Sequence, residues 1–152
     1  MSPSKVSKRV VSDRYQWIDR MIKEIKSLPL DSYDAFTADK RNVWSAESCL
    51  RRALEALMDL GRHILAKGFG RGVSEYREIA SGLEDERILS AEKGKRMKML
   101  AGYRNRMVHF YHEMSDRELY QICSSQLDDI KDIATEISRW LKNHPEIMDD
   151  TL

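Results

Sequence analysis

Residues 47–65 read Glu47-Ser-Cys-Leu-Arg-Arg-Ala-Leu-Glu-Ala-Leu-Met-Asp-Leu-Gly-Arg-His-Ile-Leu65. Apolar residues recur in this stretch at intervals of three and four positions. Because an α-helix completes a turn every 3.6 residues, this spacing places them along one face. The stretch therefore predicts an amphipathic helix with one buried face. We expect the helix to begin near Ser45, a possible cap, and to be closed by Gly68.

The same helical spacing appears in three other parts of the chain. These are residues 4–28, ended by Pro29; residues 91–110, opened by a capping Ser90; and residues 115–141, opened by the capping-box pattern Ser115-Asp-Arg-Glu118. Shorter helical segments are expected at 33–36 and 74–80. Seven Gly and three Pro leave few helix breakers. The sequence predicts an all-α fold, an antiparallel bundle of four long helices plus one or two short ones.

Length and composition limit the domain organisation and the location. With 152 residues, 41% of them hydrophobic, the chain predicts a single domain over residues 1–152 whose residues 143–152 form a frayed acidic tail. It contains no apolar run long enough for a membrane span, and its N-terminus is too polar for a signal peptide. We therefore expect a cytoplasmic protein without membrane contact. Cys49 and Cys123 lack zinc-site spacing and are predicted to be buried, reduced thiols.

The basic residues of interest are concentrated in one stretch of the chain. The net charge of +1 argues against a surface that is basic throughout. A single basic stretch contains Lys93, Lys95, Arg96, Lys98, Arg104 and Arg106, with only Glu92 opposing them. The stretch could orient an anionic ligand, or it could be an ordinary solvated helix face.

The residues best suited to catalysis lie at the C-terminal end of this basic stretch. Residues 103–111 read Tyr103-Arg-Asn-Arg-Met-Val-His-Phe-Tyr111, which contains the pattern Arg-x-x-x-x-His-x-Tyr. On a regular helix Arg104 and Tyr111 differ by about 20°, whereas Arg104 and His109 lie about 140° apart. Arg104 and His109 therefore converge in one of two ways. Either the long Arg104 side chain and a distorted helix end bring them together, or two copies of the helix pack around a two-fold axis.

The chain resembles HEPN domains, and among them the HepT-type toxins that pair with a minimal nucleotidyltransferase antitoxin. The resemblance covers residues 47–65, 74–79 and 99–111. Arg104, Asn105 and His109 match the family's pattern of an arginine, a polar residue and a later histidine, and Tyr111 matches the subgroup's additional tyrosine. Tyr103 departs from the hydrophobic residue that commonly precedes the arginine. The resemblance implies an HEPN-like bundle, a homodimer with its cleft at the interface, and an antitoxin that adenylylates Tyr111.

The residue types then suggest how RNA would be cleaved. His109 would take a proton from a 2′-hydroxyl or give one to the departing 5′-oxygen, Arg104 would hold the phosphate, and Asn105 would orient either group. This chemistry requires no metal or other cofactor, and its need for a 2′-hydroxyl selects RNA over DNA. We expect the RNA backbone to be bound by a group of basic residues, Lys95, Arg96, Lys98 and Arg106.

The same residues are compatible with other functions. A non-catalytic HEPN subunit that binds a nucleotidyltransferase or a nucleotide is the main alternative, and a purely structural helical dimer is another. His109, His112 and Glu113 could hold a metal ion, but no further ligand stands at useful spacing, so we expect no metal site. The intact set of Arg104, Asn105, His109 and Tyr111 favours the ribonuclease.

Overall fold

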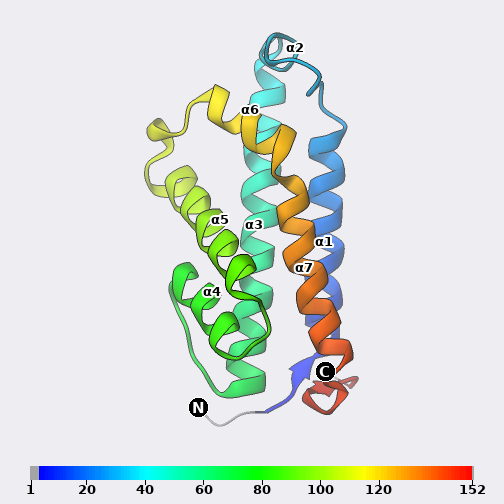
Figure 1. Ribbon diagram of the computed structural model, residues 1–152. Helices are drawn as coiled ribbons and strands as arrows, with labels where there is room; N and C mark the ends of the chain where they lie inside the picture. The colour runs from blue at the N-terminus through cyan, green and yellow to red at the C-terminus, as the bar shows by residue number, and fades with distance from the viewer. Residues whose placement is uncertain (1–3, 152) are drawn as a thin grey trace.

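The computed structural model describes residues 4–151, which form a bundle of helices (Figure 1). The α-helices are α1 (Lys8–Lys26), α2 (Tyr33–Thr37), α3 (Lys40–Phe69), α4 (Tyr76–Asp85), α5 (Ala91–His109), α6 (Asp116–Ser125) and α7 (Leu127–Lys142). The described chain also contains two 3-10 turns, η1 (Tyr111–Glu113) and η2 (Pro145–Ile147), and two short strands, β1 (Val6–Ser7) and β2 (Met148–Asp149). The predicted all-α fold is confirmed. The four long helices are accompanied by three short α-helices rather than one or two.

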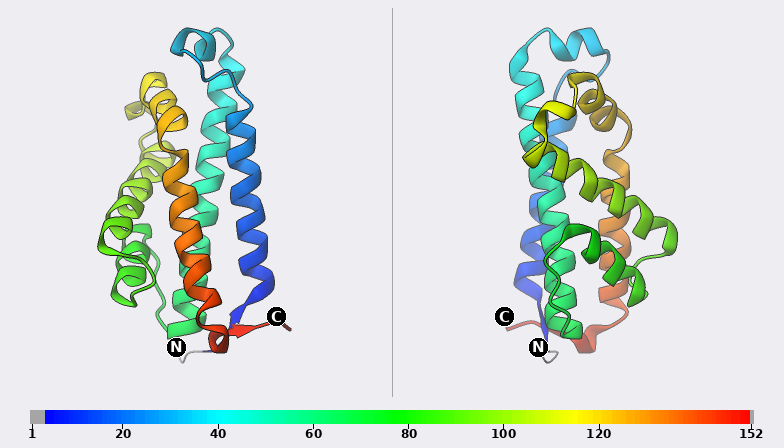
Figure 2. Two further views of the ribbon diagram at one scale, coloured as in Figure 1. Left: turned by 45° about the vertical axis from the view of Figure 1, so that its right-hand side comes forward. Right: turned by 90° about the vertical axis from the view of Figure 1, so that its left-hand side faces the viewer.

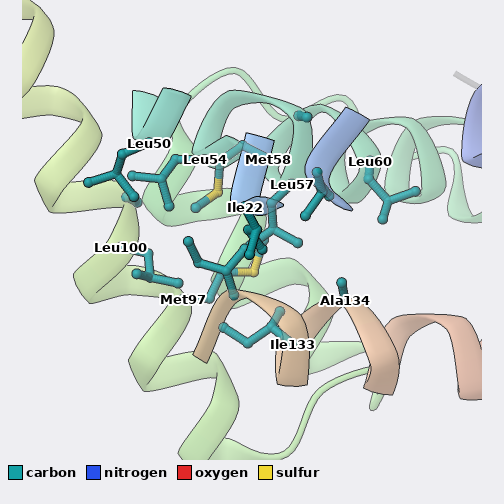
Figure 3. Packing of buried hydrophobic residues seen from close by; sticks show 14 of the residues in the cluster. Ile22, Leu50, Leu54, Leu57, Met58, Leu60, Met97, Leu100, Ile133 and Ala134 are labelled. Atoms are coloured by element: carbon teal, nitrogen blue, oxygen red, sulfur yellow. The ribbon is translucent and has the colours of Figure 1, made fainter. Parts of the chain in front are cut away.

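The core lies where the long helices meet. In Figures 1 and 2, α1, α3 and α7 run side by side, and α5 crosses them obliquely. Figure 3 shows core side chains from all four helices, among them Ile22, Leu54, Leu57, Met97, Leu100 and Ile133, all of them buried. Burying a side chain of this size stabilises the fold by about 1.5–3 kcal/mol. The cluster therefore fixes α5 against the rest of the bundle. Within residues 4–151, none of the helices combines the length and the apolar character that crossing a membrane requires.

Helix α4 packs very closely on α3, and Gly61 makes this possible. A Cβ atom at Gly61 would lie 2.7 Å from Cγ2 of Ile79 and 3.0 Å from Cδ1 of Leu83, both on α4. A side chain at this position of α3 would therefore force α4 outward. Helix α4 also packs along α5, and both views of Figure 2 show the two side by side.

The first helix begins later than the sequence predicts. It starts at Lys8 rather than Ser4, because the hydroxyl of Ser7 accepts a hydrogen bond from the backbone N–H of Val10 at 3.1 Å and caps the helix there. The residues before it form β1, which pairs in parallel with β2. Residues 1–3, part of the polar N-terminal segment for which no signal peptide is expected, lie outside the described residues.

Both ends of α3 also differ from the prediction. The helix begins at Lys40, where the carboxylate of Asp39 accepts the backbone N–H of Arg41 at 2.9 Å, and not near Ser45. It is closed by Gly70, whose φ of 65° is the left-handed conformation that favours glycine, and not by Gly68. Gly68 instead leaves room for the side chain of Ile147 in η2.

The helix predicted over residues 115–141 is interrupted at Gln126. The hydroxyls of Ser124 and Ser125 donate to backbone carbonyls one turn earlier, which competes with the helical ladder, and the chain turns at Gln126. The side-chain oxygen of Gln126 accepts a hydrogen bond from the hydroxyl of Tyr103 at 3.1 Å. The predicted start is confirmed, since Ser115 accepts the backbone N–H of Glu118.

The described part of the acidic tail contains short regular elements. Residues 145–147 form η2, and residues 148–149 form β2, with Met148 opposite Val6 and Asp149 opposite Ser7. This pairing satisfies backbone groups of the tail, and fraying of residues 143–152 stays a prediction. Leu152, the last residue of that tail, lies outside the described residues.

The two cysteines occupy different environments. Both are free thiols, as predicted, and Cys123 is buried. Burial raises the pKa of Cys123 to about 12, so its thiol stays protonated at neutral pH. Cys49 is only half-buried, which corrects the prediction that both are buried.

Candidate active site

The predicted catalytic residues lie around one surface hollow between α4 and α5, with a volume of about 540 Å³. It is lined by Arg62, Ser74, Glu75, Tyr76, Arg77, Arg104, Asn105, His109 and Phe110. We call this the α4–α5 hollow. Arg104, Asn105 and His109 all contribute to it within one chain, although an ideal helix separates Arg104 from His109 by about 140°. The length of the Arg104 side chain lets it reach the same hollow.

Arg104 is held firmly at the inner side of the hollow. Its Nε atom lies 3.4 Å from Oε1 of Glu55 on α3, and its guanidinium carbon lies 4.7 Å from the ring centroid of Tyr76 on α4. The Nε atom is buried and makes no hydrogen bond within the described residues, while 21% of the side chain is exposed. Arg104 therefore joins three helices and still reaches the hollow.

Arg62 fixes the α4 side of the hollow. Its guanidinium donates to the backbone carbonyls of Val73 and Ser74, each at 3.2 Å, and lies 3.3 Å from a carboxylate oxygen of Asp59. The carbonyls belong to the loop that leads into α4. The guanidinium carbon of Arg62 also lies 5.5 Å from the ring centroid of Tyr76. The Tyr76 ring thus contacts two arginines, and burial is the main cause that raises the pKa of its phenol.

His109 and Asn105 supply an imidazole and an amide to the hollow. They lie four residues apart on α5, about one turn, which places them on the same side of the helix. His109 is the last residue of α5 and is exposed. The helix ends there because Phe110 takes φ −134° and ψ 46°. An exposed imidazole at a helix end is accessible to a substrate that enters the hollow.

Tyr111 does not line the α4–α5 hollow. Because α5 ends at His109, the helical angle of about 20° between Arg104 and Tyr111 does not apply to the real chain. Tyr111 begins η1, and 72% of it is exposed. It borders a separate small crevice formed by Val43, Glu47, Met107, Met114, Ser115, Asp116 and Leu119.

The basic residues expected to bind RNA lie outside the hollow. Arg96 pairs with Glu92 at 2.7 Å and with Asp129 at 3.4 Å. Arg106 makes two hydrogen bonds with Glu118, at 2.9 Å and 2.6 Å, and this partner raises the pKa of the Arg106 guanidinium. Of the remaining two, Lys95 is exposed and Lys98 is half-buried. None of the four, all within the described residues, lines the hollow.

Arg62, Tyr76 and Arg77 also line the hollow but were not predicted from the sequence. They come from α3 and α4, so no local pattern joins them to Arg104. Two features of the sequence could have pointed to them. Residues 74–79 belong to the resemblance, and Glu55, Asp59 and Arg62 share one charged face of α3 because they are spaced by four and three residues.

The groups in the hollow suit an anionic ligand. Three guanidinium groups and one imidazole stand against one carboxylate, that of Glu75. Guanidinium groups bind phosphates through paired hydrogen bonds, and imidazole can both accept and donate a proton at neutral pH. Among residues 4–151, no group of three or more His, Cys, Asp and Glu side chains is placed to hold a metal ion.

Comparison with known proteins adds three findings. A family model described as ribonuclease HepT-like matches residues 18–137. The chain is 23% identical over 133 residues to a protein named tRNA nuclease HepT from Aphanizomenon flos-aquae, covering 87% of this chain and 90% of that protein. Among solved structures it is similar to a tri-AMPylated Shewanella oneidensis HEPN toxin in complex with MNT antitoxin, with a TM-score of 0.77 and 22% identity over 86% of this chain and 97% of that one.

A further solved structure has the same fold. It is the cytosolic protein of unknown function YutE from Bacillus subtilis, with a TM-score of 0.74 and 19% identity over 92% of this chain and 94% of that chain. The match to the HEPN toxin identifies the bundle as HEPN-like, which confirms the fold that the resemblance implied.

Proposed function

This chain belongs to the HepT-like ribonuclease family, and on that basis we propose that it cleaves RNA in the α4–α5 hollow as the toxin of a toxin–antitoxin pair. The observation that carries the proposal is that Arg104, Asn105 and His109 line one hollow whose lining contains three guanidinium groups and one carboxylate. The relative named tRNA nuclease HepT makes tRNA the first substrate to test. One structural match is named as a cytosolic protein, which agrees with the predicted cytoplasmic location.

The proposed reaction uses side chains that the hollow contains. One imidazole takes the proton of a ribose 2′-hydroxyl, and that oxygen attacks the neighbouring phosphorus. The bond between phosphorus and the 5′-oxygen breaks, and the 5′-oxygen takes a proton from an imidazolium, either the one just formed or that of the partner's His109. The products are a 2′,3′-cyclic phosphate and a 5′-hydroxyl. Arg104 stabilises the extra negative charge on the phosphate, Asn105 orients the imidazole or the phosphate, and no metal is required.

We further propose that two copies pair through the outer face of α5. Its stripe at intervals of three and four residues consists of Lys95, Met99, Gly102, Arg106 and His109. Met99 is 47% exposed, and a Cβ atom at Gly102 would meet no described atom within 4 Å. Glycine inside a helix costs about 1 kcal/mol relative to alanine. A second α5 that crosses closely at Gly102 would explain both features and would place two His109 side chains near one cleft.

Control by a nucleotidyltransferase antitoxin is the remaining part of the proposal. The Shewanella oneidensis toxin is named as tri-AMPylated and in complex with its antitoxin. In this chain the phenol oxygen of Tyr111 would attack the α-phosphate of ATP, with loss of pyrophosphate and of the phenol proton. The exposure of Tyr111 supports this step. The added phosphodiester would bring bulk and negative charge to the turn that directly follows His109.

The test compares two neighbouring histidines. Purified protein is mixed with tRNA in EDTA, and initial cleavage rates are measured for wild type, His109→Gln and His112→Gln. Both histidines are exposed, but of the two only His109 lines the hollow. We expect His109→Gln to lose about 10²–10⁴-fold in rate and His112→Gln to stay near wild type.

Three outcomes would overturn parts of the proposal. Equal losses in both variants would remove the specific role of His109. Binding of tRNA without any cleavage by wild type would favour the non-catalytic HEPN subunit. If activity disappears in EDTA and returns with a divalent cation, the metal-independent reaction is wrong.

A further inference from the structure

The side chain of Arg104 is fixed by residues of two other helices, and neither of these residues belongs to the Arg-x-x-x-x-His-x-Tyr pattern. We propose that Tyr76 and Glu55 are positioning residues that hold the Arg104 guanidinium ready for the scissile phosphate. The proposal rests on the phosphate-binding role of Arg104 given above. It adds residues of α3 and α4 to a site whose known pattern lies on α5.

The contacts of Arg104 leave one part of its guanidinium free. The Tyr76 ring covers one face, with 4.7 Å between the guanidinium carbon and the ring centroid, well within the range of a cation–π contact. Glu55 lies 3.4 Å from the Nε atom, which is buried. Because the inner edge and one face are occupied, the terminal Nη groups are the donors left for a ligand in the hollow.

Glu55 does not cancel the positive charge that the phosphate needs. Its Oε1 atom lies 3.2 Å from Nη1 of Arg51 and 3.4 Å from Nε of Arg104. One carboxylate is thus shared between two guanidinium groups, so the cluster keeps a net positive charge. The ion pair orients Arg104 and leaves it cationic.

Tyr76 is itself held by the packing of α4 on α3. Arg62 binds the carbonyls of Val73 and Ser74, which fixes the loop just before Tyr76. Gly61 lets Ile79 approach α3 one turn after Tyr76. The position of the ring is therefore set by rigid elements, and a side chain with many rotamers, such as that of Arg104, is pre-oriented by it. Pre-oriented charge at the reacting group is what lowers the barrier for phosphate attack.

The first test is a double-mutant cycle on RNA cleavage. Tyr76→Leu removes the ring, Tyr76→Phe keeps it, and each is measured in the wild-type and Arg104→Lys backgrounds. We expect Tyr76→Leu to lower kcat about tenfold with a smaller change in KM, and Tyr76→Phe to stay near wild type. In the Arg104→Lys background, Tyr76→Leu should cause little further loss because its target is gone.

A matched control tests whether the loss of any contact between an arginine and a tyrosine ring lowers kcat. Tyr33 lies under Arg117, with 4.1 Å between the guanidinium carbon and the ring centroid, and does not line the hollow. Tyr33→Leu should therefore leave kcat unchanged. If Tyr76→Leu lowers kcat equally in both backgrounds, Tyr76 acts on the substrate directly and the positioning role is wrong.

The second test does not depend on cleavage. In ¹⁵N-labelled protein without RNA, the Nε–H signal of Arg104, assigned from its loss in Arg104→Lys, should be protected from solvent exchange and shifted by the Tyr76 ring. Tyr76→Phe should keep both properties, Tyr76→Leu should lose the ring shift, and Glu55→Gln should speed exchange. A signal unchanged in Tyr76→Leu and Glu55→Gln would overturn the proposal even if wild type cleaves RNA. The expected signals from a wild type that does not cleave would support the positioning and contradict the proposed function alone.

Discussion

Tyr111 and His109 are two residues apart, yet the end of α5 gives them different surroundings. His109 lines the α4–α5 hollow, whereas Tyr111 stands in η1 with its phenol largely exposed. The residue proposed to act on RNA and the residue proposed to accept the adenylyl group are therefore neighbours without sharing a pocket. This arrangement suits covalent control of the hollow from its rim.

Removing the phenol oxygen of Tyr111 should block adenylylation while sparing the fold. Tyr111→Phe keeps the ring and removes the acceptor oxygen, so on co-expression with the cognate nucleotidyltransferase its intact mass should show no adenylyl increment. Tyr103→Phe is the control, since the Tyr103 hydroxyl is bound to Gln126 inside the bundle and should not matter. An adenylyl increment that persists on Tyr111→Phe would show that another residue is the acceptor.

His63 illustrates a histidine whose role is structural. Its Nε2 atom accepts the backbone N–H of Ser7 at 2.9 Å, which helps hold β1 against α3. Burial first, then the nearby Lys67 and Arg14, lowers the pKa of His63. A protonated Nε2 could no longer accept that hydrogen bond.

The free energy of unfolding should therefore fall as the solution is acidified. An unfolded histidine titrates near 6.5, so the stabilisation is complete above about pH 6.5 and is lost as the pH falls toward the lower folded value. Urea unfolding at pH 7.5 and pH 5.5 measures this change. His63→Gln keeps an acceptor that does not titrate and should show a smaller difference between the two pH values. An identical difference in wild type and variant would exclude His63 as its source.

At the scale of elements, helical periodicity predicted the long helices well and their ends poorly. The apolar faces of α1, α3 and α5 could be read from spacing alone. The ends depended on partners far away in sequence. The start of α1 is preceded by a strand that pairs with residues 148–149, and Gly68 continues α3 because Ile147 packs against it.

The same reason explains which site residues could be predicted. Arg104, Asn105 and His109 lie close together on one helix, so a local pattern finds them. Tyr76 and Glu55 reach Arg104 only through the packing of α3, α4 and α5. Residue spacing within one helix cannot predict these contacts between helices.

The close packing of α4 on α3 can be tested at Gly61. Gly61→Ala places a methyl group where Cγ2 of Ile79 would be 2.7 Å away, and the branched Ile79 side chain cannot easily move aside. We expect a loss of about 1–3 kcal/mol in the free energy of unfolding, measured by urea denaturation. Gly72→Ala is the control, because a Cβ atom there meets no described atom within 4 Å. If both variants match wild type, α4 does not depend on this approach.

In the proposed dimer, the outer face of α5 would link assembly to activity. The proposed crossing at Gly102 lies between Met99 and His109 on one stripe, so a second copy would lie beside the hollow that His109 lines. The stability of the single chain would then favour a better helix former at position 102, whereas the activity of the dimer would favour glycine. Glycine weakens the helix, but a larger residue would keep the two helices apart.

The substitution Gly102→Gln tests helix stability and dimer formation separately. Glutamine is a better helix former than glycine and would have open space in the single chain, so thermal stability should stay the same or rise. Light scattering should show the variant near the 17.8 kDa of one chain and wild type near twice that mass. RNA cleavage should fall when the dimer is lost, because the partner's His109 would no longer stand near the cleft. Met99→Gln, on the same stripe but without the need for close approach, should weaken pairing less. A Gly102→Gln protein that remains a fully active dimer would rule out this face of α5 as the interface.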